Sequence, residues 1–127
     1  WFYTGGSCPY GYKLVRQGRV NKRGHELYDL VINEDEAPLV RMIFEKYVEE
    51  GRGAQSIANL LNSLNVKNRS GHNWHPSSIR GMIKNITYIG ILRSGESRSQ
   101  VLPHLRIIDE QTFGAAQEIT RQRSKTP

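Results

Sequence analysis

Residues 54–85 have the sequence AQSIANLLNSLNVKNRSGHNWHPSSIRGMIKN, which predicts two short helices joined by a polar turn. Apolar residues recur at helical spacing in the first part of this stretch and predict a helix over residues 54–64 with one buried stripe. The stripe consists of Ile57, Leu60, Leu61 and Leu64. Asn65 is expected to end this helix in the left-handed conformation, and residues 65–75 are rich in turn formers.

The second helix of this stretch is predicted over residues 76–85. Pro76 suits the first helical position, where its missing amide costs no hydrogen bond. One side of this helix is apolar, with Ile79, Met82 and Ile83. The other side is polar and basic, with Ser77, Arg80, Gly81 and Lys84.

Gly81 is unusual inside a helix, because glycine costs about 1 kcal/mol there relative to alanine. A residue without a side chain lets another backbone approach the helix closely. The sequence is equally compatible with two such partners, a crossing helix of the same chain or DNA.

Two further helices are predicted on either side of this stretch. Residues 34–50 have a helical apolar period, and Asn33 or Asp35 can cap that helix while its acidic first turn suits the helix dipole. Residues 109–123 are predicted to form the last helix, with Asp109 as its cap.

The remaining regular segments are predicted to be extended. Residues 12–16 and 27–32 are apolar runs around a polar loop at 17–26, which suggests a hairpin. Residues 88–92 and 101–108 are also predicted to be extended. The predicted fold class is therefore α+β, with a helix-turn-helix-type three-helix core and small β-hairpin or sheet elements at both ends.

The charges are segregated along the chain, whose formal net charge is +6. Residues 11–25 hold five basic residues and no acid, and residues 51–106 hold eight basic residues and one acid. Residues 34–50 between them hold six acids and two bases. This segregation favours an anionic partner, although solvated loops and a solvated helix would show the same pattern.

A short helix braced by two others, with a polar and basic outward face, is typical of a DNA-binding helix-turn-helix unit. Serine hydrogen-bonds base edges, arginine pairs with guanine, and lysine neutralises phosphate, although three packed helices also occur without DNA. The predicted recognition residues are Ser77, Ser78, Arg80 and Lys84. Ser77 and Ser78 could instead cap the first helical turn. The predicted backbone contacts are Arg69, Lys67, Lys13, Arg16, Arg19, Lys22 and Arg23.

Motifs along nearly the whole chain resemble the recombinase domain of large serine recombinases. In chain order they are Pro9-Tyr10-Gly11-Tyr12, Asp35-Glu36-Ala37, the run Val40 to Tyr47, Ser56 to Asn62, Trp74, Ser78 to Asn85, Tyr88-Ile89-Gly90 and Ile108 to Phe113. The sequence departs from the family at Ile86, where proline is frequent, and at His75, where a small capping residue is usual. These departures affect the two ends of the recognition helix.

The resemblance implies a modular parent protein, a serine site-specific DNA recombinase of bacterial or phage origin. Such a parent has an amino-terminal catalytic domain with a nucleophilic serine, then a recombinase domain, then a cysteine-rich zinc ribbon. Residues 1–8 would be a linker from the catalytic region, residues 9–123 the recombinase domain, and residues 124–127 a flexible tail. The absence of an initial methionine before Trp1 agrees with a piece of a longer protein.

The resemblance also implies a division of labour. No serine here matches the nucleophile motif of the family and no paired CxxC spacing is present, so we expect no catalysis, metal or cofactor in this piece. The expected partners are attachment-site double-stranded DNA and, through regions outside this piece, other recombinase subunits.

Other chemistry fits the sequence less well. Cys8 with His72 and His75 could hold a metal, but the two histidines precede a helix rather than share one face. Trp74 is predicted to plug the core rather than to stack on a base. A single cysteine suits a reducing, cytoplasmic compartment, and no apolar run approaches the roughly 20 residues that a membrane span needs.

Two rival functions use the same features. A transcription regulator would use the same recognition helix without strand exchange. A protein-interaction module would dock its basic face on an acidic partner, and its affinity for DNA would not depend on DNA sequence.

Overall fold

The computed structural model describes residues 8–20, 22–24, 26–94 and 97–124. Most of the linker expected at residues 1–8 and of the tail expected at residues 124–127 therefore lies outside the described residues. The chain divides into two compact units. The hairpin unit holds the residues up to Val40 and Ile86–Ile107, and the helical unit holds Arg41–Asn85 and the residues from Ile108 onward.

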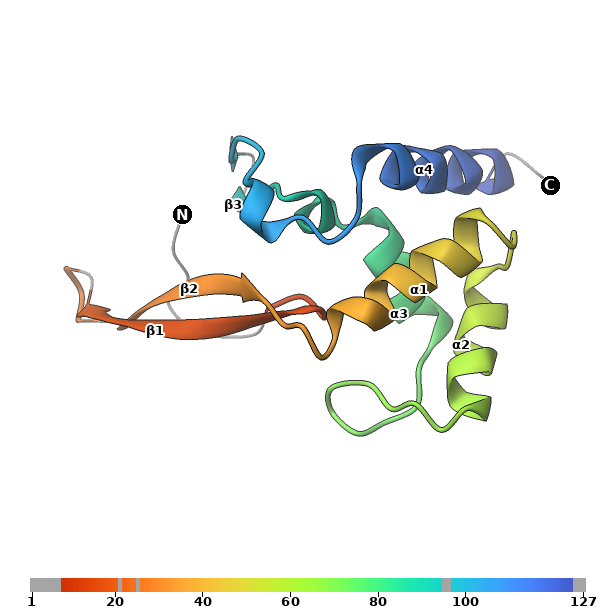
Figure 1. The fold of residues 1–127 in the computed structure, drawn as a ribbon, viewed down its shortest axis with the longest axis horizontal. Helices are drawn as coiled ribbons and strands as arrows, with labels where there is room; N and C mark the ends of the chain where they lie inside the picture. The colour runs from red at the N-terminus through yellow and green to blue at the C-terminus, as the bar shows by residue number, and fades with distance from the viewer. Residues whose placement is uncertain (1–7, 21, 25, 95–96, 125–127) are drawn as a thin grey trace. The chain divides into compact units, whose positions relative to one another are not determined.

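The hairpin unit is built on two antiparallel strands, β1 (Tyr12–Val20) and β2 (Glu26–Ile32), as the sequence predicts (Figure 1). Their register pairs Tyr12 with Ile32 and is irregular between Arg16 and Val20. Gly18 lies in that irregular stretch with φ +77°, a conformation that side chains disfavour. The strand thus continues through residues 17–20, and the prediction that these residues belong to a loop is wrong.

The core of the hairpin unit centres on two stacked tyrosines. The rings of Tyr12 and Tyr88 lie 5.7 Å apart, and both side chains are buried. The Tyr12 hydroxyl lies 2.6 Å from the carbonyl oxygens of both Thr87 and Leu105 and donates its proton to one at a time. The Tyr88 hydroxyl donates to the Tyr10 carbonyl at 2.6 Å. These bonds join the base of β1 to segments more than 70 residues away.

The prediction of strands over residues 88–92 and 101–108 is wrong. The chain instead forms two 3₁₀ helices, η1 (Ile86–Ile89) and η2 (Pro103–Leu105), and a hairpin of two-residue strands, β3 (Arg93–Ser94) and β4 (Ser97–Arg98). Gly90 explains the departure, since its φ of +90° turns the backbone toward Leu102. A Cβ at Gly90 would lie 2.6 Å from the Leu102 carbonyl oxygen, so this close approach requires glycine.

The helix α1 (Ala37–Val48) begins three residues later than the sequence predicts. The Asn33 side chain accepts a hydrogen bond from the Asp35 amide at 3.0 Å, and the Asn33 carbonyl accepts one from Ala37 at 2.8 Å. These bonds hold residues 33–36 in a turn. The acids therefore precede the helix, and Glu36 accepts a hydrogen bond from the Gly11 amide at 2.9 Å.

The helical unit contains the rest of α1 with α2 (Ala54–Ser63), α3 (Pro76–Lys84) and α4 (Glu110–Ser124) (Figure 1). These bounds lie close to the predicted helices. Asn65 ends α2 with φ 58°, as expected, and the Asp109 side chain caps α4 by accepting from the Thr112 amide at 2.6 Å. Four helices with small antiparallel hairpins confirm the predicted α+β class.

The core of the helical unit joins side chains from all four helices. Phe44 of α1 and Phe113 of α4 have ring centroids 6.0 Å apart. Trp74 is only 4% exposed, which agrees with its predicted role as a core plug. The buried residues of α2 and α3 are Ala54, Ile57, Ala58, Leu61, Ile79, Met82 and Ile83. This packing fixes which face of α3 is turned to solvent.

Candidate nucleic-acid interface

The helix α3 is positioned by its ends and by its buried face. His75 is the N-cap with extended backbone angles, and Pro76 occupies the first turn. His75 makes no side-chain cap hydrogen bond, and it stands where the family usually has a small capping residue. The Gln117 side chain of α4 donates to the Ile83 carbonyl at 2.5 Å and holds the last turn.

The solvent face of α3 carries the polar and basic side chains that the sequence predicts for it. The exposed residues are Ser77, Ser78, Arg80, Gly81 and Lys84. The helix contains no acidic residue. This face therefore offers hydroxyl groups at its first turn and cations along its length, a combination that suits both base edges and phosphates.

Gly81 lies on this exposed face with open space beside it. A Cβ added at Gly81 would meet no other atom of the described residues within 4 Å. A tight crossing with another helix of the described chain is therefore excluded as the reason for this glycine. Close approach of DNA is the other explanation that the sequence allows, and it stays a prediction.

The connection between α2 and α3 is longer than the three or four residues of an ordinary helix-turn-helix turn. It is ordered by Asn68, whose side-chain oxygen accepts from the amides of Ser70 at 2.9 Å and His72 at 3.0 Å. Asn62 of α2 also bonds both backbone groups of Trp74, at 2.8 and 3.1 Å. The connection is thus fixed to α2 at one side-chain amide.

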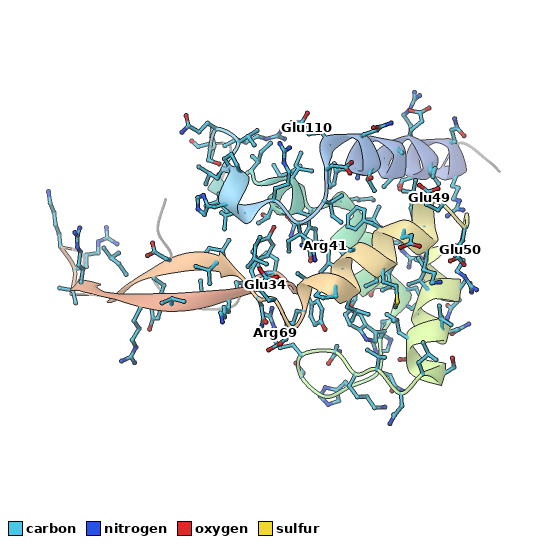
Figure 2. All side chains as sticks on the ribbon, in the orientation of Figure 1. Glu34, Arg41, Glu49, Glu50, Arg69 and Glu110 are labelled. Atoms are coloured by element: carbon cyan, nitrogen blue, oxygen red, sulfur yellow. The ribbon has the colours of Figure 1, made fainter. Side chains whose placement is uncertain are left out.

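Two of the predicted backbone contacts lie on this connection. Lys67 is exposed and donates to the Asn73 side chain at 2.7 Å. Arg69 is exposed and projects from the loop (Figure 2). Both cations are exposed at the surface of the helical unit, on the segment that leads into α3.

The other five predicted contacts belong to the hairpin unit. All five are exposed, and they are Lys13, Arg16, Arg19, Lys22 and Arg23. Lys13 and Arg16 lie on the regular part of β1, where successive side chains alternate between faces, so they point to opposite faces of the ribbon. Arg19 also lies on β1 rather than in a loop, and Lys22 and Arg23 lie in the turn.

Acidic side chains of the helical unit are engaged by neighbouring bases. Glu50 follows α1 and accepts from Lys46 at 2.7 Å and from Arg52 at 3.0 Å (Figure 2). These hydrogen bonds lower the pKa of the Glu50 carboxyl below its ordinary value. Glu118 on α4 pairs with Arg121 at 2.6 Å, and that hydrogen bond lowers the pKa of Glu118. Neither pair involves α3.

The structure gives no support for the other chemistries considered. Within the described part of the chain, no three or more His, Cys, Asp or Glu side chains are grouped closely enough to hold a metal ion. Both His72 and His75 are exposed. None of the helices in the described ranges has the length and apolar character needed to cross a membrane.

Several residues around α3 were not predicted from the sequence. Arg80 and Lys84 line a cavity together with residues of α1, α2 and α4, among them Tyr47, Thr120 and Arg123. Arg123 donates to the Gly51 carbonyl at 2.7 Å. No local sequence pattern predicts that Tyr47, Thr120 and Arg123 lie beside α3, because the cavity is lined from four separate segments of the sequence.

Comparisons with known proteins agree with the fold. The Recombinase family profile matches residues 34–123. A solved structure described as the crystal structure of an LSR–DNA complex has a TM-score of 0.71 and 25% sequence identity, and covers 98% of this chain and 34% of that chain. A second, from a study of the sequence requirements of the Listeria innocua prophage attP site, has a TM-score of 0.71 and 24% identity, and covers 98% of this chain and 47% of that chain.

The chain thus spans between a third and a half of the length of these solved relatives. No protein with a curated description matches it. The family profile covers most of the sequence, including all four helices apart from the last residue of α4. The chain therefore belongs to the Recombinase family and has the fold of the corresponding part of large serine recombinases (LSRs).

Proposed function

We propose that this chain is the DNA-binding part of a serine site-specific recombinase and that it binds one half of an attachment site. The observation that carries the proposal is α3, a helix packed on α2 and α4 whose exposed face is polar, basic and free of acids. Membership of the Recombinase family supports it, as does the likeness to an LSR–DNA complex.

The exposed face of α3 would enter the major groove. The groove is about 12 Å wide and admits one α-helix. Ser77 and Ser78, in the first turn, would hydrogen-bond base edges, because a hydroxyl both donates and accepts. Gly81, one turn further along, would let the helix lie close to the DNA surface.

Phosphate contacts would set the position of the domain on the duplex. In the helical unit, Lys67 and Arg69 would contact the backbone beside α3. Cations on the ribbon face that meets the duplex, or in its turn, would contact the backbone elsewhere. The candidates are Lys13, Arg16, Arg19, Lys22 and Arg23. Each neutralised phosphate lowers the slope of log affinity against log salt concentration by about 0.9.

Strand exchange would be performed elsewhere in the parent protein. The resemblance to the family supports this assignment, since no serine here matches the nucleophile motif of the family. The other recombinase subunits would associate through regions beyond this piece. This chain would therefore bind the target site, and the rest of the parent protein would carry out strand exchange.

The test is selection of duplex DNA from a random pool by this chain, followed by affinity measurements on the selected and a scrambled duplex. We expect a consensus, and a preference for it that falls by about tenfold in Ser77→Ala/Ser78→Ala, equivalent to 1.4 kcal/mol. Ser63→Ala/Ser97→Ala, with both changes at exposed sites outside α3 and the connection that leads into it, is the matched control and should keep the preference.

The outcomes separate recognition of a DNA site from a phosphate-binding face and from a protein-interaction module. Equal affinity for both duplexes would refute recognition of a site and leave a basic phosphate-binding face. Absence of binding to either duplex would favour a module that docks an acidic protein.

A further inference from the structure

A cavity of about 350 Å³ lies in the helical unit at the last turns of α3. All four helices or their junctions contribute to it. Its lining residues are Tyr47, Gly53, Ala54, Arg80, Ile83, Lys84, Thr120 and Arg123.

The charges around the cavity are all of one sign. Arg80 and Lys84 reach it from successive turns of α3, and Arg123 reaches it from the last turn of α4. No acidic side chain is among the lining residues. No ion pair within the described part of the chain engages Arg80 or Lys84. Three cations that converge without a carboxylate favour an anionic occupant.

One wall of the cavity is held by contacts within the chain. The Arg123 guanidinium donates to the carbonyls of Gly51 at 2.7 Å and Arg52 at 3.4 Å, and it lies 5.0 Å from the centre of the Tyr47 ring. The Tyr47 and Thr120 hydroxyls are 2.7 Å apart. Arg123 is thus held in place by neutral groups rather than by a carboxylate, so it needs little rearrangement to bind an anion.

The start of α2 adds a weaker positive potential to that of the three cations. Gly53 is the N-cap of α2 and offers no side chain to the first amides of the helix. Those amides lie at the positive end of the helix dipole, beside the three cations. The cations define the site, and the helix start strengthens it.

We propose that Arg80, Lys84 and Arg123 form a seat for one backbone phosphodiester of the bound DNA. This inference rests on the proposed function and deepens it. Lys84 follows Ser77 by seven residues, which is about 10 Å along a helix. The phosphates line the edges of a major groove about 12 Å wide, so a helix with its first turn on the bases brings its last turns to the backbone. Arg80 is thereby assigned to phosphate, although the sequence suggested pairing with a base.

The first test is the salt dependence of affinity for the selected duplex and its scrambled version. Lys84→Gln and Arg80→Gln should each lower the magnitude of the slope of log affinity against log salt concentration by up to about 0.9. Each should lower the affinities for the selected and the scrambled duplex by the same factor. Arg121→Gln removes the same charge from α4 outside the cavity, and it should leave both affinities nearly unchanged. Thermal melting of each variant checks that it folds.

The second test replaces single phosphates of the duplex by neutral methylphosphonates, one position at a time. At one position in each half-site, the replacement should lower the duplex affinity of the original protein. It should lower the affinity of Lys84→Gln much less, because the cation that contacts this phosphate is already missing there. Arg80→Gln should couple to that same position. Arg123→Lys keeps the charge but loses the forked donor, and it should retain part of the coupling.

Each result decides between named readings. If the affinity losses from the substitution and from the methylphosphonate simply multiply at every position, the seat is refuted. An Arg80→Gln or Lys84→Gln effect confined to one base pair would refute it as well. Binding of inorganic phosphate at the cavity without coupling to DNA phosphates would also overturn it. Sequence-selective binding without coupling between these substitutions and a DNA phosphate would refute only the phosphate seat. Failure to bind any duplex would refute both the seat and the proposed function.

Discussion

Basic residues are arranged differently in the two units of the chain. In the hairpin unit, Lys13 and Arg16 lie on opposite faces of a two-stranded ribbon, so their charges diverge. In the helical unit, Arg80, Lys84 and Arg123 come from two helices and line one cavity. Basic segments of the sequence therefore produce a diffuse positive ribbon in one unit and a concentrated site in the other. Backbone geometry, more than the number of charges, makes the difference.

The largest effect should follow a carboxylate placed on the exposed face of α3. Gly81→Glu fits the protein, because a Cβ there meets no described atom within 4 Å, and glutamate is a better helix former than glycine. The carboxylate would face DNA phosphates, and like-charge contact of this kind costs several kcal/mol. We expect duplex affinity to fall on the order of 1,000-fold, about 4 kcal/mol, with an unchanged or higher melting temperature.

A matched control exists on α4. Gly114 is also an exposed helical glycine whose added Cβ would meet no described atom within 4 Å. Gly114→Glu makes the same chemical change away from α3 and should reduce affinity only by the small effect of net charge. Similar losses in both variants would show that α3 is not the DNA-binding face.

The second effect is on stability and compares the glycines of the two units. Gly90→Ala should destabilise the hairpin unit by about 2–3 kcal/mol, because φ is +90° and the new Cβ would overlap the Leu102 carbonyl. Gly81→Ala should instead stabilise the helical unit by about 0.5–1 kcal/mol. Thermal melting with amide hydrogen exchange of each unit measures both, and equal signs for the two substitutions would contradict the geometry.

A smaller effect should separate the two faces of the hairpin. A ribbon presents one face to a duplex, so only one of Lys13→Gln and Arg16→Gln should lower the magnitude of the salt slope, by about 0.9. The other variant should bind as the original protein does, and it serves as the matched control. Equal changes in both slopes would mean that the ribbon contacts DNA along its edge or not through these side chains.

Local patterns predict the helical unit well. The apolar stripes of α2 and α3, the left-handed Asn65 and the Asp109 cap are each encoded within a few residues, and the helix ends fall close to the predicted ones. The exposed face of α3 follows from the same period, since the positions of Ile79 and Ile83 fix the opposite side. Interactions within one or two turns are what a sequence pattern can resolve.

Long-range contacts explain what the sequence pattern misses. Residues 88–92 are a short apolar run like that of a buried strand, but the turn at Gly90 and the hydrogen bonds of the buried Tyr12 hydroxyl hold this region in 3₁₀ turns. The cavity beside α3 is missed for the same reason. Its cations Arg80 and Arg123 are brought together by packing of α3 and α4, which no local period reports.

The smallest effect is on stability and concerns Glu50, which is paired with Lys46 and Arg52. Hydrogen bonds from Lys46 and Arg52 lower the pKa of Glu50 in the folded chain, whereas the pKa of a glutamate in the unfolded chain is about 4.3. A lowered folded pKa contributes stability that is present above the unfolded value and is lost as pH falls through the folded value. Glu50→Gln should therefore be slightly less stable than the original protein at pH 7, and the two melting temperatures should converge in acid. Glu49→Gln removes the same charge one residue earlier, and it should not reproduce that convergence if the pairs with Lys46 and Arg52 are its cause.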